Sequence, residues 1–174
     1  MRSIIALALA ITLPLSALAE EAAEKKAPEP SKTPEDCYAL ACKALCDGDG
    51  DLYWFCLSKG TRKLMMEQAA EAKKNHQKEL AAALKIEVEA LEKLEPRDIA
   101  LRQILGMMND EYRKLLKEQK LTDVKIDGDK ATATLEIGDD RMPIEFMKED
   151  EGWRINVSGG GGHDHDHEHE EEGK

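Results

Sequence analysis

The feature that most constrains the fold is a change of hydrophobic period near residue 124. Upstream, apolar residues recur every three or four positions, which is typical of one face of a helix, whereas downstream they alternate with polar residues, as in half-buried strands. Turns rich in Gly and Asp, at residues 127–129, 138–140 and 149–152, separate the alternating segments. The alternating apolar residues are Val124 and Ile126; Ala131, Ala133, Leu135 and Ile137; Met142, Ile144 and Phe146; and Trp153, Ile155 and Val157. The sequence therefore predicts a four-stranded antiparallel meander with one apolar face, covered by the upstream helices in an α+β fold.

The first upstream helix is predicted from residue 34, because Thr33 suits the N-cap and Pro34 the first helical position. It ends at the DGDGD stretch, residues 47–51. Alternating Asp residues occur in EF-hand calcium loops, but the positions where that loop needs Gly and Glu hold Leu52 and Ser58. The stretch is therefore interpreted as a turn that leads into a short second helix.

Two longer helices are predicted next. Residues 61–94 contain no Gly or Pro and are rich in Ala, Glu, Lys and Leu, although residues 71–79 are so polar that this part of the helix is expected in solvent. Pro96 then starts a helix that extends to about residue 120. Its apolar stripe is expected to face the core, and it consists of Leu101, Ile104, Leu105, Met108, Tyr112 and Leu115.

The two ends of the chain differ from this middle part. Residues 1–19 combine one basic residue, an apolar run and a small-residue end, which predicts a cleaved signal peptide and a periplasmic or secreted protein. A membrane anchor is the competing interpretation, but Pro14 interrupts the run, and no span is expected after cleavage. Residues 20–33 are interpreted as a disordered leader, residues 34–158 as one domain, and residues 159–174 as a flexible Gly linker and tail.

The formal net charge of −11 argues against nucleic acid or an anionic membrane as a partner. Four cysteines lie within twenty residues, and in an exported chain disulfides are the default expectation. The fold-back of the second helix makes Cys42–Cys56 the preferred pair. Cys37 and Cys46 cannot bond if both lie in the first helix, since they would be about 13 Å apart, so the remaining pairing stays open. A zinc site made of all four thiolates is a competing interpretation, but no CxxC pair supports it.

The stretch DVKIDGDKATATLEIGDDRMPIEFMKEDEGWRINV resembles the C-terminal sheet of small exported domains of the nuclear-transport-factor-2-like (NTF2-like; SnoaL-like, cystatin-like) class, and YALACKALCDGDGDLYWFCLSKGTRKLM resembles their first two helices. The resemblance covers roughly residues 34–157. It implies a curved sheet wrapped around a helix, forming a cone with a pocket at its open end. It is weak for activity, because this fold hosts isomerases, dehydratases and binding modules, and homodimers are expected only by analogy.

No catalytic residue stands out, although enzymes of this class place an Asp, His or Tyr in the cone. His76 lies among charged residues and is interpreted as a surface residue, while Asp110 is the only acid worth testing. The three tyrosines, Tyr38, Tyr53 and Tyr112, are equally well explained as core aromatics. The chain is accordingly expected to be a binding protein rather than an enzyme, and no organic cofactor is indicated.

The tail carries the clearest chemistry. Four histidines alternate strictly with acids, and the candidate ligands are His163, Asp164, His165, Asp166, His167, Glu168 and His169. Imidazole is the commonest side-chain ligand for zinc, nickel and copper, and carboxylates complete such shells. The sequence therefore favours a protein that binds or buffers transition-metal ions. The alternatives are an NTF2-like module that binds an unknown small molecule or protein partner, with the tail secondary, and, third, an NTF2-like lyase or isomerase.

Overall fold

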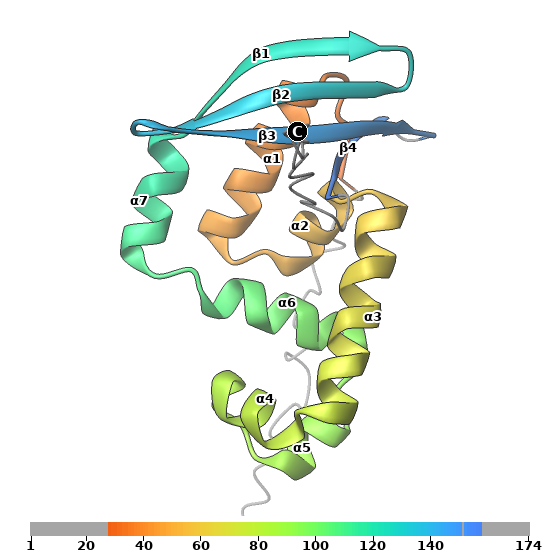
Figure 1. Cartoon of the computed structure of the whole chain (residues 1–174), viewed down its shortest axis with the longest axis vertical. Coiled ribbons are helices and arrows are strands. Elements are labelled where there is room, and N and C mark those ends of the chain that lie inside the picture. Colours follow the sequence, from red (N-terminus) through yellow and green to blue (C-terminus); the bar gives the residue numbers. More distant parts are fainter. Residues whose placement is uncertain (1–27, 151, 158–174) are drawn as a thin grey trace, which may run out of the picture.

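A four-stranded antiparallel sheet and a set of helices beneath it form the two layers of the molecule (Figure 1). The structure is a computed structural model that describes residues 28–150 and 152–157. The predicted signal peptide, most of the predicted leader and the predicted metal-binding tail lie outside the described residues. Within these residues the helices are α1 (Pro34–Asp47), α2 (Gly50–Cys56), α3 (Lys59–Asn75), α4 (Gln77–Leu84), α5 (Val88–Glu92), α6 (Pro96–Gly106) and α7 (Asp110–Glu118), and the strands are β1 (Lys120–Asp127), β2 (Lys130–Ile137), β3 (Asp140–Glu149) and β4 (Gly152–Asn156).

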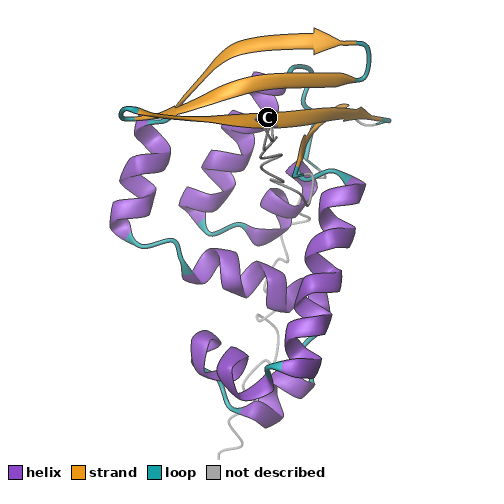
Figure 2. Ribbon diagram, in the orientation of Figure 1, coloured by secondary structure: helices purple, strands orange, loops and turns teal. Residues whose placement is uncertain are grey.

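The α+β class and the meander predicted from the alternating residues are confirmed, with the strands in the order β1-β2-β3-β4 in an open sheet. Helices and strands occupy separate layers (Figure 2). The register places Ala131 between Ile126 and Phe146, and Phe146 beside Ile155, so an apolar row crosses all four strands on one face. Phe146, Ala131 and Ile155 are buried in the core, which they share with residues of the helices.

The outer edge of β4 is covered by two other segments, the residues before α1 and the start of α3. The carbonyl of Ser31 accepts from the Trp153 amide at 2.9 Å, the Ser58 amide donates to the Ile155 carbonyl at 2.8 Å, and the Thr61 hydroxyl accepts from the Val157 amide at 2.7 Å. Within the described residues these contacts cover the outer edge of β4, so another strand cannot pair there. Ser31 is buried even though the sequence places it in the leader.

Gly152 makes the close approach of residues 30–31 to β4 feasible. Its φ is +115°, and a Cβ atom at this position would stand 2.4 Å from the Ser31 carbonyl oxygen. Only glycine adopts this positive φ without strain and has no Cβ atom to clash with Ser31. The opposite edge of the sheet, β1, has no such cover, but its pairing is interrupted between Thr122 and Lys125, where Asp123 has a φ of +53°. Such an irregularity protects an edge strand from pairing with a second chain.

The first two helices form as the sequence predicts. The Thr33 side chain accepts from the Asp36 amide at 3.1 Å, Pro34 opens α1, and Gly48 ends it in the left-handed conformation. Asp49 then caps α2, because its side chain accepts from the Leu52 amide at 3.1 Å. The DGDGD stretch is thus a turn with two helix caps.

The prediction of one helix over residues 61–94 is wrong. The chain leaves helical geometry at His76, where φ is −133°, and again at Lys85, which adopts the left-handed conformation. The resulting α4 turns back, so that Leu80, Ala81 and Leu91 are buried. Burial of these apolar residues outweighs the intrinsic helix propensity of the polar stretch that precedes them.

The second long helix is also divided. It stops after Gly106, and Asn109 caps a separate α7 by accepting from the Tyr112 amide at 2.8 Å. The stripe expected in the core is split accordingly: Leu101 is buried, whereas Tyr112 is 48 % exposed and no residue of α7 is buried. None of the described helices is long and apolar enough to cross a membrane.

Candidate functional site

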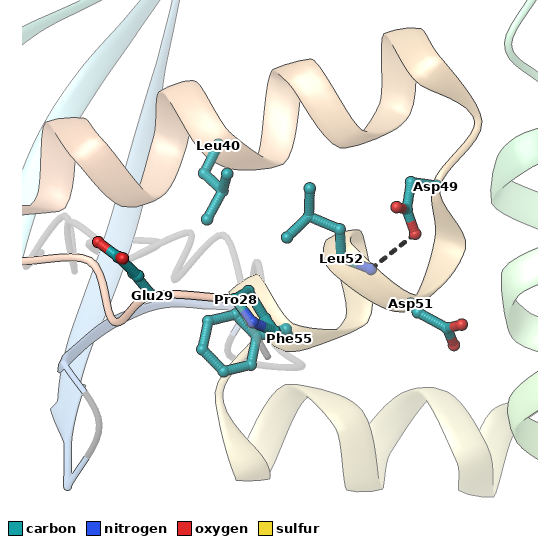
Figure 3. A pocket seen from close by; sticks show the side chains of 7 residues that line it. All are labelled: Pro28, Glu29, Leu40, Asp49, Asp51, Leu52 and Phe55. Atoms are coloured by element: carbon teal, nitrogen blue, oxygen red, sulfur yellow. Dashed lines mark hydrogen bonds between the residues drawn. The ribbon is translucent and has the colours of Figure 1, made fainter. Parts of the chain in front are cut away.

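A pocket of about 640 Å³ lies between α1, α2 and the segment that precedes α1. Its apolar walls are Leu40 of α1 and Leu52 and Phe55 of α2, and Figure 3 shows these side chains directed toward a shared space. Pro28 and Glu29 close one end, and Asp49 and Asp51 lie at the other. Pockets of this size, apolar with a few polar groups, are typical of small-molecule sites.

The turn between α1 and α2 positions the two walls. Gly48 reverses the chain, and the cap formed by Asp49 fixes the first turn of α2, so that Leu52 and Phe55 face Leu40. Gly50 packs closely on α6, because a Cβ atom there would stand 3.3 Å from a methyl carbon of Leu105. The helix pair therefore rests on α6, which supports the pocket from outside.

The carboxylates at the pocket already have partners inside the protein. Asp51 forms an ion pair with Arg97, whose guanidinium lies 5.6 Å from the ring centroid of Trp54, and Asp49 holds the helix cap. Glu29 is exposed at the other end. The pocket thus combines apolar walls with ends that carry acidic side chains, of which Asp51 is paired with Arg97.

Behind Phe55 the domain buries a positive charge. Arg154 of β4 is only 2 % exposed, its guanidinium carbon lies 4.0 Å from the centroid of the Phe55 ring, and its Nη1 donates to the Trp153 carbonyl at 3.0 Å. The aromatic face and the carbonyl together offset part of the cost of removing this charge from water.

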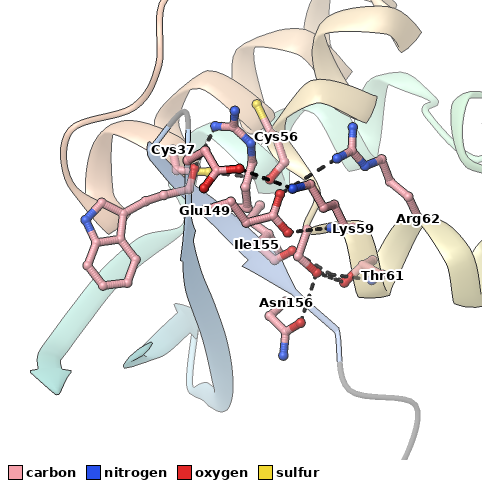
Figure 4. Close-up of polar contacts among 12 residues, drawn as sticks. Cys37, Cys56, Lys59, Thr61, Arg62, Glu149, Ile155 and Asn156 are labelled. Atoms are coloured by element: carbon pink, nitrogen blue, oxygen red, sulfur yellow. Dashed lines mark hydrogen bonds and ion pairs between the residues drawn. The ribbon is translucent and has the colours of Figure 1, made fainter. Parts of the chain in front are cut away.

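Two buried thiols lie beside Arg154. Cys37 of α1 is 0 % exposed and Cys56 at the end of α2 is 1 % exposed, and the Cys37 thiol donates to the Cys56 carbonyl at 3.5 Å (Figure 4). The Cys56 thiol lowers the pKa of Cys37, and Arg154 lowers it further, while burial acts in the opposite sense. The pKa of Cys56 is raised, first by the neighbouring Cys37 and then by burial. Of the two thiols, Cys37 is the more acidic.

The disulfide expected between Cys42 and Cys56 is not present. All four cysteines are free thiols, and Cys37, rather than Cys42, contacts Cys56. Cys42 lies on another side of α1 beside Tyr38, and burial raises its pKa. Tyr38 donates a hydrogen bond to Gln119, and burial raises the pKa of its phenol as well. The expected pairing aligned the two helices about the middle of the turn, whereas the rotation of α1 in the structure brings Cys37 to the interface with α2.

A polar network attaches α3 to the β3–β4 hairpin (Figure 4). Ser58 is buried and donates to Asn156 Oδ1 at 2.9 Å, while Glu149 accepts from the Lys59 amide at 2.6 Å and lies 3.8 Å from the Arg62 guanidinium. Each group caps the helix or pairs with a neighbour, so the network is structural.

The candidate acids and bases do not meet in the described part of the chain. His76 is exposed between α3 and α4, as predicted, and Asp110 is exposed at the start of α7. Neither lines the pocket. Of the three tyrosines, Tyr38 and Tyr53 pack against the core, but Tyr112 does not. Within residues 28–150 and 152–157, no group of three or more His, Cys, Asp or Glu side chains is placed to hold a metal ion, and the predicted ligands of the tail lie outside these residues.

Sequence reasoning missed the pocket and the buried guanidinium. Leu40, Leu52 and Phe55 read as ordinary core residues, and no local pattern distinguishes a wall of a pocket from a core position. Arg154 falls on the polar side of the alternation in β4, which predicts exposure. Only the tertiary neighbours that cover both sides of β4 distinguish Arg154 from an exposed residue, and the sequence does not reveal these neighbours.

Comparison of the chain with protein-family models, with curated proteins and with solved structures found no match.

Proposed function

We propose that this chain is an exported, non-enzymatic binding protein whose C-terminal tail binds or buffers transition-metal ions. The observation that carries the proposal is the strict alternation of His163, His165, His167 and His169 with acidic residues, after four glycines. In an extended segment, alternate residues point to one side about 7 Å apart, so two imidazoles converge on one ion after modest bending. The intervening carboxylates add attraction for a divalent cation or orient the imidazoles.

The test is a titration of zinc, nickel and copper against a competing chelator. Two forms are compared, the chain without its first 19 residues and the same chain ending at Ser158. We expect micromolar or tighter binding confined to the tailed form, weakening as the pH falls through about 6.5, where histidine becomes protonated. Equal binding by both forms would contradict the proposal.

Matched variants separate histidine ligation from simple acidity. Replacing the four tail histidines by Asn removes the imidazoles and keeps every carboxylate, whereas replacing Asp164, Asp166 and Glu168 by their amides keeps every imidazole. We expect the first variant to lose nearly all binding and the second to retain most of it, because the imidazole nitrogens supply the principal bonds to these metals. The opposite ranking would indicate a nonspecific acidic tail.

The second candidate function rests on the pocket between α1 and α2. We propose that it takes a small apolar molecule with a positively charged group, since its walls are Leu40, Leu52 and Phe55 and its ends carry Glu29, Asp49 and Asp51. The tail would then be secondary. Of the two candidates, this is the one that the described residues themselves support.

Displacement of a neutral fluorescent apolar dye tests this candidate. We expect dodecyltrimethylammonium to displace the dye at lower concentration than dodecyl sulfate, because the charge at the pocket is negative. The variant Leu52→Asn should weaken dye binding at least several-fold, whereas Leu115→Asn on exposed α7 is the matched control and should not. Equal loss in both variants would overturn the pocket assignment.

Membership of the NTF2-like class is also a proposal, supported by the open meander with helices on one of its faces. The enzymatic alternative, a lyase or isomerase, needs a positioned acid or base. Among the described residues, no histidine lines the pocket, and Asp49 and Asp51 are occupied by a helix cap and an ion pair, so that alternative has no residue assigned to it in this part of the chain.

A further inference from the structure

The core contains two thiols that come from different helices and meet beside β4. Cys37 lies in the first turns of α1 and Cys56 is the last residue of α2, and both are almost completely buried. The Cys37 thiol reaches the Cys56 carbonyl at 3.5 Å, and the two thiols are close enough to affect each other's proton. The residues between them form the rest of α1, the turn and most of α2, so a bond at this point would close this helical hairpin covalently.

We propose that Cys37 and Cys56 form the disulfide of this domain when the chain meets an oxidising thiol–disulfide pool, and that Cys42 and Cys46 remain outside it. One thiolate attacks a disulfide of the pool and releases one thiol, and the second cysteine then attacks the mixed disulfide and releases the other. The protein loses two protons and two electrons, and the disulfide of the pool is reduced to two thiols.

Either sulfur can make the first attack in this scheme. The thiolate is the nucleophile in thiol–disulfide exchange, and the Arg154 guanidinium beside both thiols favours the thiolate of each. Because both sulfurs are buried in the folded domain, exchange proceeds through opening of the α1–α2 pair or before folding is complete.

The other pairings are disfavoured by helix geometry. Cys42 is five residues beyond Cys37 on α1, which is about 140° around the helix axis. When the Cys37 sulfur faces Cys56, the Cys42 sulfur therefore points to a different side of α1. Cys42 and Cys46 are one helical turn apart, with Cβ atoms about 5–6 Å apart, whereas a disulfide needs about 3.5–4.5 Å. A bond between them would require that α1 be distorted.

The bond would also affect the pocket. Cys37 precedes Leu40 by one turn of α1, and Cys56 directly follows Phe55, so the disulfide would join the two helices that form the pocket walls. It would fix their separation and limit the size of a bound molecule.

Two double variants of the chain without its first 19 residues test the pairing. Cys42→Ser with Cys46→Ser keeps the proposed pair, and Cys37→Ala with Cys46→Ser keeps the competing pair of Cys42 and Cys56. Each protein is refolded with oxidised and reduced glutathione, and its free thiols are counted after denaturation. We expect the first variant to lose both thiols and to gain on the order of 10 °C in Tm, reversibly with reductant, while the second keeps its thiols.

A map of the unmodified chain keeps the test independent of how the variants fold. No Lys or Arg separates Cys37 from Cys42, or Cys46 from Cys56, so trypsin leaves each pair of cysteines on one peptide. Chymotrypsin, which cleaves after Tyr38, Trp54 and Phe55, separates them. A cross-linked peptide that joins Cys37 to Cys56 supports the proposal. A Cys42–Cys56 link, or four free thiols after oxidative refolding, would overturn it.

Discussion

Arg154 shows how a single residue departs from its sequence pattern. It is the largest of the fully buried side chains, although the alternation of β4 assigns it to the polar face of the sheet. The alternation predicts exposure only when one face of a strand meets water, and β4 is covered on both sides and along its edge. The sequence correctly predicted the strand and its neighbours Trp153 and Ile155. It could not predict the environment of the residue between them, because α1 and α2 provide it.

Replacing Arg154 should therefore have a large effect on stability. We expect Arg154→Ala to lower the free energy of unfolding by about 3 kcal/mol, since it removes the stack on Phe55 and a buried hydrogen bond and leaves a cavity. Arg141→Ala is the matched control. Arg141 pairs with Asp123 and Glu136 on an exposed surface, and its loss should change stability by less than about 1 kcal/mol. Chemical denaturation measures both, and similar effects for the two variants would contradict the burial of Arg154.

Tyr53 makes folding sensitive to alkaline pH. Burial raises the pKa of its phenol, so the folded state favours the neutral form, whereas the unfolded chain ionises near pH 10. The stabilisation is complete below about pH 10 and is lost as the pH rises above that value. We expect Tyr53→Phe to flatten the decline of unfolding free energy above pH 10, with exposed Tyr112→Phe as the control. An unchanged slope in Tyr53→Phe would refute this assignment.

At the scale of elements, helix ends were predictable and helix continuity was not. Thr33, Pro34 and Gly48 bound α1 because their conformational preferences act locally. The break at His76 lets α4 turn back so that Leu80 is buried, and the break after Gly106 separates α6, which buries Leu101, from α7, which buries no residue. Such breaks depend on contacts distant in sequence, and residues 71–79 indicated only a polar stretch.

Two N-caps of different burial should contribute unequally. Ser58 caps α3 from a buried site and also donates to Asn156, whereas Thr33 caps α1 at an exposed one. We expect Ser58→Ala to lower the free energy of unfolding by about 2 kcal/mol and Thr33→Ala by about 1 kcal/mol. The larger loss follows from the buried polar groups left without a partner. Thermal and denaturant unfolding of both variants measures the difference, and a reversed order would count against the described network.

At the scale of the whole molecule, we expect different elements to unfold locally with different free energies. β2 and β3 are paired on both sides, whereas α7 buries no residue of its own. We therefore expect amide hydrogens of α7 to exchange first and those of β2 and β3 to exchange only on global unfolding. Hydrogen exchange followed by mass spectrometry measures this order. Uniform protection across α7 and β3 would show that α7 is held by contacts other than those described.

The fold class was within reach of sequence reasoning because the change of hydrophobic period is a property of the whole chain. The candidate pocket was not, since Leu40, Leu52 and Phe55 become neighbours only after α2 folds back on α1. The tail is the reverse case: its candidate ligands follow one another in the sequence, so their pattern can be recognised without any tertiary structure.

The contact between Ser31 and Trp153 joins the beginning of the domain to its last strand. A ribosome delivers Ser31 early and Trp153 late, so this pairing must wait for almost the entire domain to be synthesised, and native closure is a late, nonlocal event. The same proximity brings the two ends within reach of a short peptide linker. A circularly permuted gene that joins them and opens the chain at the exposed turn around Gly128 would let the last strand emerge before α1 and reverse the order of closure.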